Sequence, residues 1–405
     1  MKKNLSWNTI GMILYNLAVW VFGFLIIRML GEVHSGYYAI ASSVGNTIYA
    51  VSLWGMRSYI VSDTESRYTE NEYLTSRILS ILISCVVLVM TALIGGYGPE
   101  VTHVLYAYTL FKMSEALIEV LDCFGQKRLI MDINAKSMVL RGLLYMVFFW
   151  LTLRFTADMT AGFAVMAGIS LLVFFFYNLR KMRSVAEIRG LSGNLAHLKE
   201  ILVRCFPIMA FEVLSSSVVA VPRLFFSRQG SMADLGVYNS IYTMVIFLQL
   251  TVNILIYTLS PYLARSYQSH DKSSYRKYLL LLVGGACFLA AGAELLVFLI
   301  GKPVMSLLFG SGPGQMYHYL YLGILSGLSL TFTWIITQIF VIKGYLYAHL
   351  ICALISAGSC FLFSAWLIRP ENCNTISIVL ICTNLVFLCA AGILLRYKPA
   401  GTVHN

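Results

Sequence analysis

Long apolar stretches recur along the whole chain, and this recurrence constrains the fold more than any other feature of the sequence. Each stretch has roughly 18 to 25 residues, enough to cross about 30 Å of hydrocarbon as a helix rising 1.5 Å per residue. Of the 405 residues, 59% are hydrophobic and only 12% are charged, a balance far more apolar than that of soluble domains. The sequence therefore predicts an all-α integral membrane protein.

Counting these stretches predicts twelve transmembrane helices. The first of them follows Lys2 and Lys3 and is too long for a signal peptide, so we expect it to remain as a helix. The expected spans lie at about residues 9–29, 37–61, 78–97, 102–121, 137–155, 160–178, 206–228, 236–263, 279–300, 317–341, 346–368 and 375–395.

The basic residues predict the orientation of the chain. Most of the 29 Lys and Arg residues fall in connections on one side of the membrane if the N-terminus is inside, and short basic loops are retained in the cytoplasm. Both termini are therefore expected to be cytoplasmic. This asymmetry and contact with anionic headgroups of membrane lipids explain the net charge of +11, so we expect no binding to nucleic acid.

A long basic connection divides the chain into six spans and six spans. We expect residues 1–190 to form an N-lobe with helices 1–6, residues 191–205 a cytoplasmic amphipathic linker helix, and residues 206–405 a C-lobe with helices 7–12. A solvated basic linker is the alternative for the middle segment. A trio of residues at the first junction between spans recurs at an offset of 200, as Arg28, Gly36 and Tyr38 and then Arg228, Gly236 and Tyr238. This match favours a parallel repeat, hence two six-helix bundles that rock against each other.

Four ionisable residues within the fourth span form a stripe. Lys112, Glu115, Glu119 and Asp122 fall within an arc of roughly 80° on one helical face. One interpretation is a polar seam that joins this helix to a neighbour. The other is the wall of a hydrated cavity, where Lys112 binds an anion and Glu115 or Glu119 exchanges a proton or ion.

Further basic residues lie within or at the ends of spans. Arg28, Arg57 and Arg141 are candidates for binding substrate, although each can also anchor a helix end by reaching to the interface. Arg223 follows Pro222, which can bend its helix and carry the arginine into a cavity. Because guanidinium matches phosphate oxygens, these residues and Lys112 favour a cargo that carries phosphate.

Several chemistries lack their motifs. The sequence contains no GxxxxGK[ST] phosphate loop, no HExxH zinc motif and no metal-ligand spacing among its nine cysteines. We therefore expect a protein that is not an enzyme, with no catalytic residues, no metal and no cofactor. Any uphill drive would come from an ion gradient or the membrane potential.

Five strings resemble a known family: KNLSWNTIGMILYNL, GMRSYIVSD (55–63), MDINAKSMVLRG (131–142), VPRLFF (221–226) and TLSPYLARSY (258–267). They are similar to the bacterial O-antigen type flippases of the multidrug/oligosaccharidyl-lipid/polysaccharide (MOP) exporter superfamily. The resemblance implies a MATE-like fold, and it places Arg57 and Asp63, then Asp132, Lys136 and Arg141, and finally Arg223 on family positions.

The same resemblance implies a flippase in the bacterial cytoplasmic membrane. Its cargo would be an undecaprenyl-diphosphate-linked oligosaccharide repeat unit for O-antigen, capsule or exopolysaccharide, moved by alternating access through a central cationic cavity. Glycan polymerase and glycosyltransferases are the expected partner enzymes, and the flippase is expected to act as a monomer. The alternatives are a cation-coupled multidrug exporter of the same superfamily and, from another class, a polytopic glycosyltransferase or polymerase.

Overall fold

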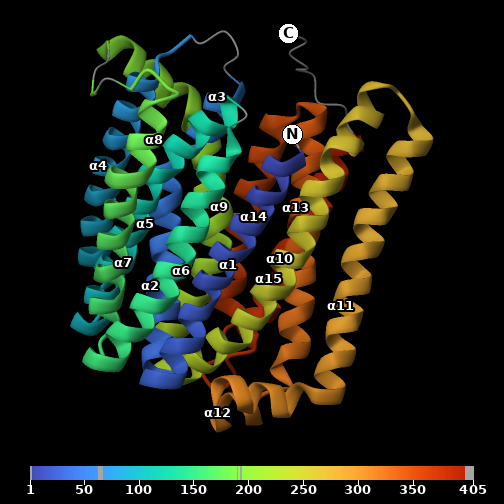
Figure 1. Ribbon diagram of the computed structural model, residues 1–405. Helices are drawn as coiled ribbons and strands as arrows, with labels where there is room; N and C mark the ends of the chain where they lie inside the picture. The colour runs from blue at the N-terminus through green and yellow to red at the C-terminus, as the bar shows by residue number, and fades with distance from the viewer. Residues whose placement is uncertain (1, 63–66, 129, 189, 192–193, 397–405) are drawn as a thin grey trace. The chain divides into compact units, whose positions relative to one another are not determined.

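The computed structural model describes residues 2–62, 67–128, 130–188, 190–191 and 194–396, and the regular structure in these ranges is helical (Figure 1). The one strand-like pairing within them is an isolated β-bridge between Arg369 and Asn372. The all-α fold predicted from the apolar stretches is therefore confirmed.

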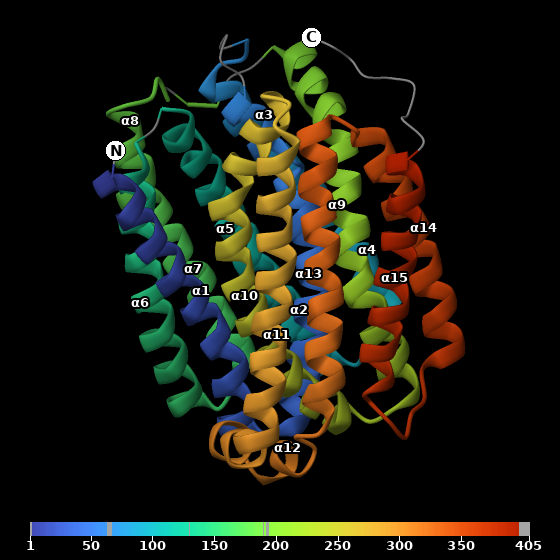
Figure 2. The same cartoon turned by 90° about the vertical axis from the view of Figure 1, so that its right-hand side faces the viewer.

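The chain divides into two compact units, and unit 1 covers Met1–Ser217. Its elements are α1 (Lys2–Leu30), α2 (Glu32–Leu53), α3 (Met56–Ser62), α4 (Glu70–Gly95), α5 (Pro99–Lys127), α6 (Met131–Thr156), α7 (Met159–Val173), the π-helical turn η1 (Phe174–Leu179), α8 (Arg180–Arg183) and the first part of α9 (Leu195–Gln229). Within this unit α1 packs along α6, and α2 packs along α5 (Figures 1 and 2). Aromatic rings fill the space between these helices, among them the buried Phe22, Phe111, Tyr145, Phe149 and Phe163.

Unit 2 covers Val218–Asn405 and contains the rest of α9. Its other helices are α10 (Met232–Gln268), α11 (Lys272–Phe309), α12 (Ser311–Gln315), α13 (Tyr319–Lys343), α14 (Leu346–Leu367) and α15 (Thr375–Arg396). Here α10, α11 and α13 pack on one another, and α14 lies beside α15 (Figure 2).

Ten helices in the described part of the chain are long and apolar enough to cross a membrane, so the protein is a multi-pass membrane protein. They correspond to all of the expected spans except the second and the fourth, which are α2 and α5. These two helices have 22 and 29 residues and are long enough, but they carry more polar side chains. Because they pack against each other and bury much of their surface in unit 1, they need less apolar surface than a helix that faces lipid. The twelve-span count and the two six-helix bundles stay predictions.

The expected second span, residues 37–61, is broken into α2 and α3. Trp54 and Gly55 separate the two helices, and both have left-handed backbone conformations with φ of 51° and 62°. The indole Nε1 of Trp54 donates a hydrogen bond of 2.8 Å to the carbonyl oxygen of Leu202 in α9. The break places Arg57 on the short helix α3 and not on one continuous second span, as the range 37–61 had predicted.

Gly55→Ala is expected to destabilise the protein by on the order of 1–3 kcal/mol. Alanine is strained at a φ of 62°, and its Cβ would lie 2.7 Å from side-chain atoms of Ile208. Gly168→Ala in α7 is the matched control, because its Cβ would meet nothing within 4 Å and alanine favours a helix. Thermal unfolding of both purified variants in detergent makes the comparison, and equal midpoints would contradict the assignment of strain to Gly55.

The residues expected in a separate linker helix, 191–205, run without interruption into the following span from Leu195 onward. The resulting helix α9 has 35 residues and continues past both Pro207 and Pro222. Membrane helices tolerate internal prolines because neighbouring groups satisfy the freed carbonyls. Residues 192–193 lie outside the described residues, and the boundary between the two units falls within α9, after Ser217. The expected lobe boundaries stay predictions.

Candidate functional site

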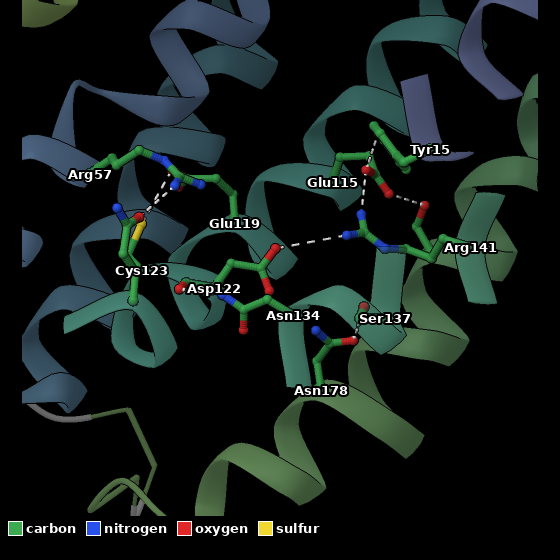
Figure 3. Close-up of polar contacts among 12 residues, drawn as sticks. Tyr15, Arg57, Glu115, Glu119, Asp122, Cys123, Asn134, Ser137, Arg141 and Asn178 are labelled. Atoms are coloured by element: carbon green, nitrogen blue, oxygen red, sulfur yellow. Dashed lines mark hydrogen bonds and ion pairs between the residues drawn. The ribbon is translucent and has the colours of Figure 1, made fainter. Parts of the chain in front are cut away.

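The charged stripe predicted on the fourth span lies on α5, and its acidic residues contact arginines from three other helices (Figure 3). Glu115 pairs with Arg141 of α6, and Asp122 lies near the same arginine. Glu119 pairs with Arg57 of α3 and with Arg77 of α4. The carboxylates of α5 therefore contact arginines at two places along the helix. Arg141 lies beside Glu115 and Asp122, and Arg57 and Arg77 lie beside Glu119.

Glu115 is buried and accepts hydrogen bonds from four side chains on three helices. The donors are Tyr15 of α1, Arg141 and Tyr145 of α6, and Ser170 of α7, whose Oγ lies 3.0 Å from Oε1 of Glu115. The Arg141 guanidinium also lies 5.0 Å from the ring centroid of Tyr15. A buried carboxylate is tolerated when its oxygens are satisfied in this way, so Glu115 joins α1, α5, α6 and α7.

Asp122 lies beside the same arginine, Arg141. Its Oδ2 lies 3.8 Å from Nη2 of Arg141, and its backbone oxygen accepts a 2.7 Å hydrogen bond from Nδ2 of Asn134. The other carboxylate oxygen, Oδ1, is buried and has no hydrogen-bond partner among the described residues. The side chain of Asp122 is buried inside unit 1, where α6 covers it.

The π-helical turn η1 makes a further polar contact with α6. Its Asn178 accepts a 2.8 Å hydrogen bond at Oδ1 from the hydroxyl of Ser137 in α6, and both side chains are buried (Figure 3). Such turns inside α-helices occur often at functional sites. Here the turn directs an amide toward α6.

Glu119 holds two arginines of different exposure. Its Oε1 lies 2.8 Å from Nε of Arg57, and its Oε2 lies 2.6 Å from Nη2 of Arg77. Arg77 is completely buried and also donates a 2.6 Å hydrogen bond to the carbonyl oxygen of Ser52 in the last turn of α2. The side chain of Arg57 is 48% exposed and donates from Nη1 to Gln126 at 2.9 Å. Of the two arginines, only Arg57 is accessible to a ligand.

Lys112 of α5 lies beside aromatic rings and forms no ion pair with another described residue. Its Nζ lies over the ring of Tyr49, 4.5 Å from the centroid, and 6.0 Å from the centroid of Phe111. The neighbouring acid Glu115 is engaged by Arg141. An aromatic face attracts a cation without neutralising it, so these contacts do not replace a counter-charge for Lys112.

Arg28 and Arg223, two further candidates, are not part of this group. Arg28 is exposed in the last turn of α1. Arg223 belongs to unit 2, where it is buried with its guanidinium 4.2 Å from the ring centroid of Tyr242 and 5.9 Å from that of Tyr238. Unit 2 therefore holds a separate cation among tyrosines.

Sequence reasoning missed several members of the site, above all Arg77, which lies just before the expected span 78–97. The signal for it was Glu119 itself, because a carboxylate buried in a membrane protein requires a basic partner. Among the positions implied by the family resemblance, Asp132 and Lys136 form an exposed ion pair of 3.2 Å at the start of α6. Asp63 lies outside the described residues.

Metal binding has no support from the arrangement of side chains. Among the described residues, no group of three or more His, Cys, Asp or Glu side chains is placed to hold a metal ion. Among the site residues described above, Lys112 forms no ion pair and Arg57 is half-exposed.

Comparison with known structures defines the fold. The lipid II flippase MurJ in an inward closed conformation matches with a TM-score of 0.73 and 12% identity, over 97% of this chain and 87% of that chain. A multidrug resistance MATE family transporter of the MOP superfamily in an inward-facing conformation matches with a TM-score of 0.72 and 14% identity, over 98% of this chain and 100% of that chain. The chain therefore has the same fold as these two membrane proteins.

Comparison of sequences gives a more particular likeness. The chain is 23% identical over 316 residues to the capsular polysaccharide biosynthesis protein CapF of Staphylococcus aureus. The matched residues cover 78% of this chain and 79% of that protein. No sequence-family model matches the chain. Together with the fold, this likeness confirms the resemblance to the polysaccharide flippases of the MOP superfamily.

Proposed function

We propose that the protein is a flippase that moves an undecaprenyl-diphosphate-linked oligosaccharide across the cytoplasmic membrane for the synthesis of a surface polysaccharide. The observation that carries this proposal is the arrangement of charge in unit 1, where arginines contact the acids of α5 while Lys112 and the half-exposed Arg57 keep donors for an anion. The likeness to CapF and to MurJ supports a lipid-linked saccharide as the cargo.

In this proposal Lys112 and Arg57 contact the phosphates of the cargo. Arg57 is attached to Glu119, which lies seven residues from Lys112, or about 10 Å along α5. Arg141 and Glu115 satisfy each other, and this favours a structural role for them over the predicted roles in substrate binding and ion coupling. Substrate binding by Arg28 and Arg223, ion coupling by Glu119, alternating access, monomeric action and partner glycosyltransferases and polymerase stay predictions.

A deletion strain tests the function directly. Loss of surface polymer with accumulation of lipid-linked repeat units is expected, and the intact gene should restore both. Restoration with Arg57→Ala should be incomplete, while Lys136→Ala, which removes an exposed ion pair, is the matched control and should restore fully. Surface polymer and extracted lipid-linked intermediates are measured together, and unchanged polymer in the deletion strain would overturn the proposal.

A second candidate function is cation-coupled multidrug export, and the likeness to the multidrug MATE transporter supports it. An exporter of cationic drugs needs acidic side chains that face its cargo, and Glu212 of α9 is a half-buried acid of unit 1. Dye efflux separates the two candidates. Retained dye and normal surface polymer in the deletion strain would favour drug export.

A further inference from the structure

A shallow, open hollow with basic side chains lies on the surface of α11, near the start of this helix in unit 2. The hollow has a volume of about 740 Å³ and is lined by Lys272, Ser273, Arg276, Lys277, Leu280 and Leu281. All three basic side chains are exposed, and none forms an ion pair with another described residue. The nearby carboxylate of Asp271 instead accepts hydrogen bonds from the backbone of Ser273 and Ser274, at 3.0 and 3.1 Å.

The basic residues of this hollow are followed along the same helix by two exposed leucines, Leu280 and Leu281. Lys272, Arg276 and Leu280 follow one another at intervals of four residues, so they form one row along the helix. Leu280 and Leu281 are 60% and 53% exposed. A ligand that fills the hollow would therefore need an anionic head and a hydrocarbon tail.

Two further observations favour a position of the hollow at the membrane interface. Helix α11 has 38 residues, about 57 Å at 1.5 Å per residue, so its first turns extend beyond the roughly 30 Å of hydrocarbon. Tyrosines of α10 and α11 also gather there, with Tyr262 packed on Tyr278 and Tyr267 on Tyr275 at centroid distances of 5.6 and 6.0 Å. Tyrosines are enriched at the level of the headgroups.

We infer that this hollow binds the headgroup of an anionic phospholipid of the surrounding bilayer, with an acyl chain lying on Leu280 and Leu281. Each basic residue near an anionic headgroup contributes roughly a fivefold gain in binding, so three of them contribute on the order of 100-fold. A gain of this size suits a lipid that is abundant in the membrane. A scarce lipid-linked cargo would require a more enclosed site with hydrogen bonds from several sides.

The test is equilibrium binding of a fluorescent phosphatidylglycerol to the purified full-length protein in detergent. The triple variant K272Q/R276Q/K277Q is expected to bind on the order of 100-fold more weakly. The triple variant R180Q/K181Q/R183Q is the matched control, because it removes the same charge from exposed positions of another helix, α8 in unit 1, and it should stay within about threefold.

Three further binding measurements identify the ligand of the hollow. Leu280→Gln should weaken lipid binding without a change of charge, phosphatidylcholine should not compete, and millimolar inorganic phosphate should not displace the lipid. Equal losses in the two triple variants would mean general electrostatic attraction and would overturn the proposal. Displacement by inorganic phosphate, or by stoichiometric lipid-linked oligosaccharide, would assign the hollow to a free anion or to the cargo. Because transport is not measured, failure here leaves the proposed function untouched.

Discussion

Arg141→Ala is expected to lower the free energy of unfolding by about 3–5 kcal/mol, because it leaves the carboxylate of Glu115 buried without its counter-charge. Asp122 loses its basic neighbour at the same time, since Nη2 of Arg141 lies 3.8 Å from its Oδ2. The loss should appear as a lower midpoint of thermal unfolding in detergent and as reduced abundance in the membrane.

Two variants make this expectation specific to the ion pair. Adding Glu115→Gln to Arg141→Ala should recover part of the loss, because the neutral amide needs no counter-charge and can still bond to the hydroxyls of Tyr15 and Tyr145. Lys136→Ala on the same helix removes an exposed pair and should change stability by no more than about 0.5 kcal/mol. An Arg141→Ala protein as stable as the parent would mean that the buried pair does not hold unit 1 together.

Lys112→Ala is expected to reduce transport roughly 10- to 100-fold while leaving stability nearly unchanged. The range corresponds to the loss of one charge-assisted hydrogen bond to a phosphate, about 1.5–3 kcal/mol. No described carboxylate pairs with Lys112, so its removal leaves no buried counter-charge behind. The initial rate of translocation of a lipid-linked oligosaccharide in proteoliposomes measures the effect.

Conservative variants separate charge from packing at this position. Lys112→Arg keeps the positive charge and should retain part of the rate, and Tyr49→Phe keeps the aromatic face beneath the ammonium and should be close to the parent. If Lys112→Ala lowered the unfolding midpoint as far as Arg141→Ala does, Lys112 would belong to a structural seam, and the proposed contact with phosphate would be wrong.

Helical periodicity was sufficient to predict the charged face of α5. Residues at offsets of 3, 7 and 10 share a face whenever the segment is helical, so the grouping of Lys112, Glu115, Glu119 and Asp122 depends only on local structure. The structure places all four on one continuous helix. The apolar stretches gave the class of fold for a similar reason, because crossing hydrocarbon sets the length and composition of each helix.

The partners of that face were not predictable in the same way. Arg141 and Tyr15 lie 26 and 100 residues from Glu115 in the sequence, and their contacts depend on how the helices pack. Arg77 was misplaced because it comes just before an apolar stretch, where a hydropathy count sees a loop and the structure has the third turn of α4. The break at Trp54 and Gly55 was missed because tryptophan seldom takes a left-handed conformation.

The π-helical turn between α7 and α8 also lets this part of the chain differ in length without a change in the helix on either side. A π turn holds one residue more than an α turn over the same stretch of helix, so it is in effect a tolerated insertion. Deleting a single residue between Phe174 and Asn178 would restore regular α-helix and leave the helix on either side in nearly the same orientation. Asn178, near the end of the turn, would then still face Ser137. Related chains with this contact are therefore expected in two lengths, with and without the extra residue.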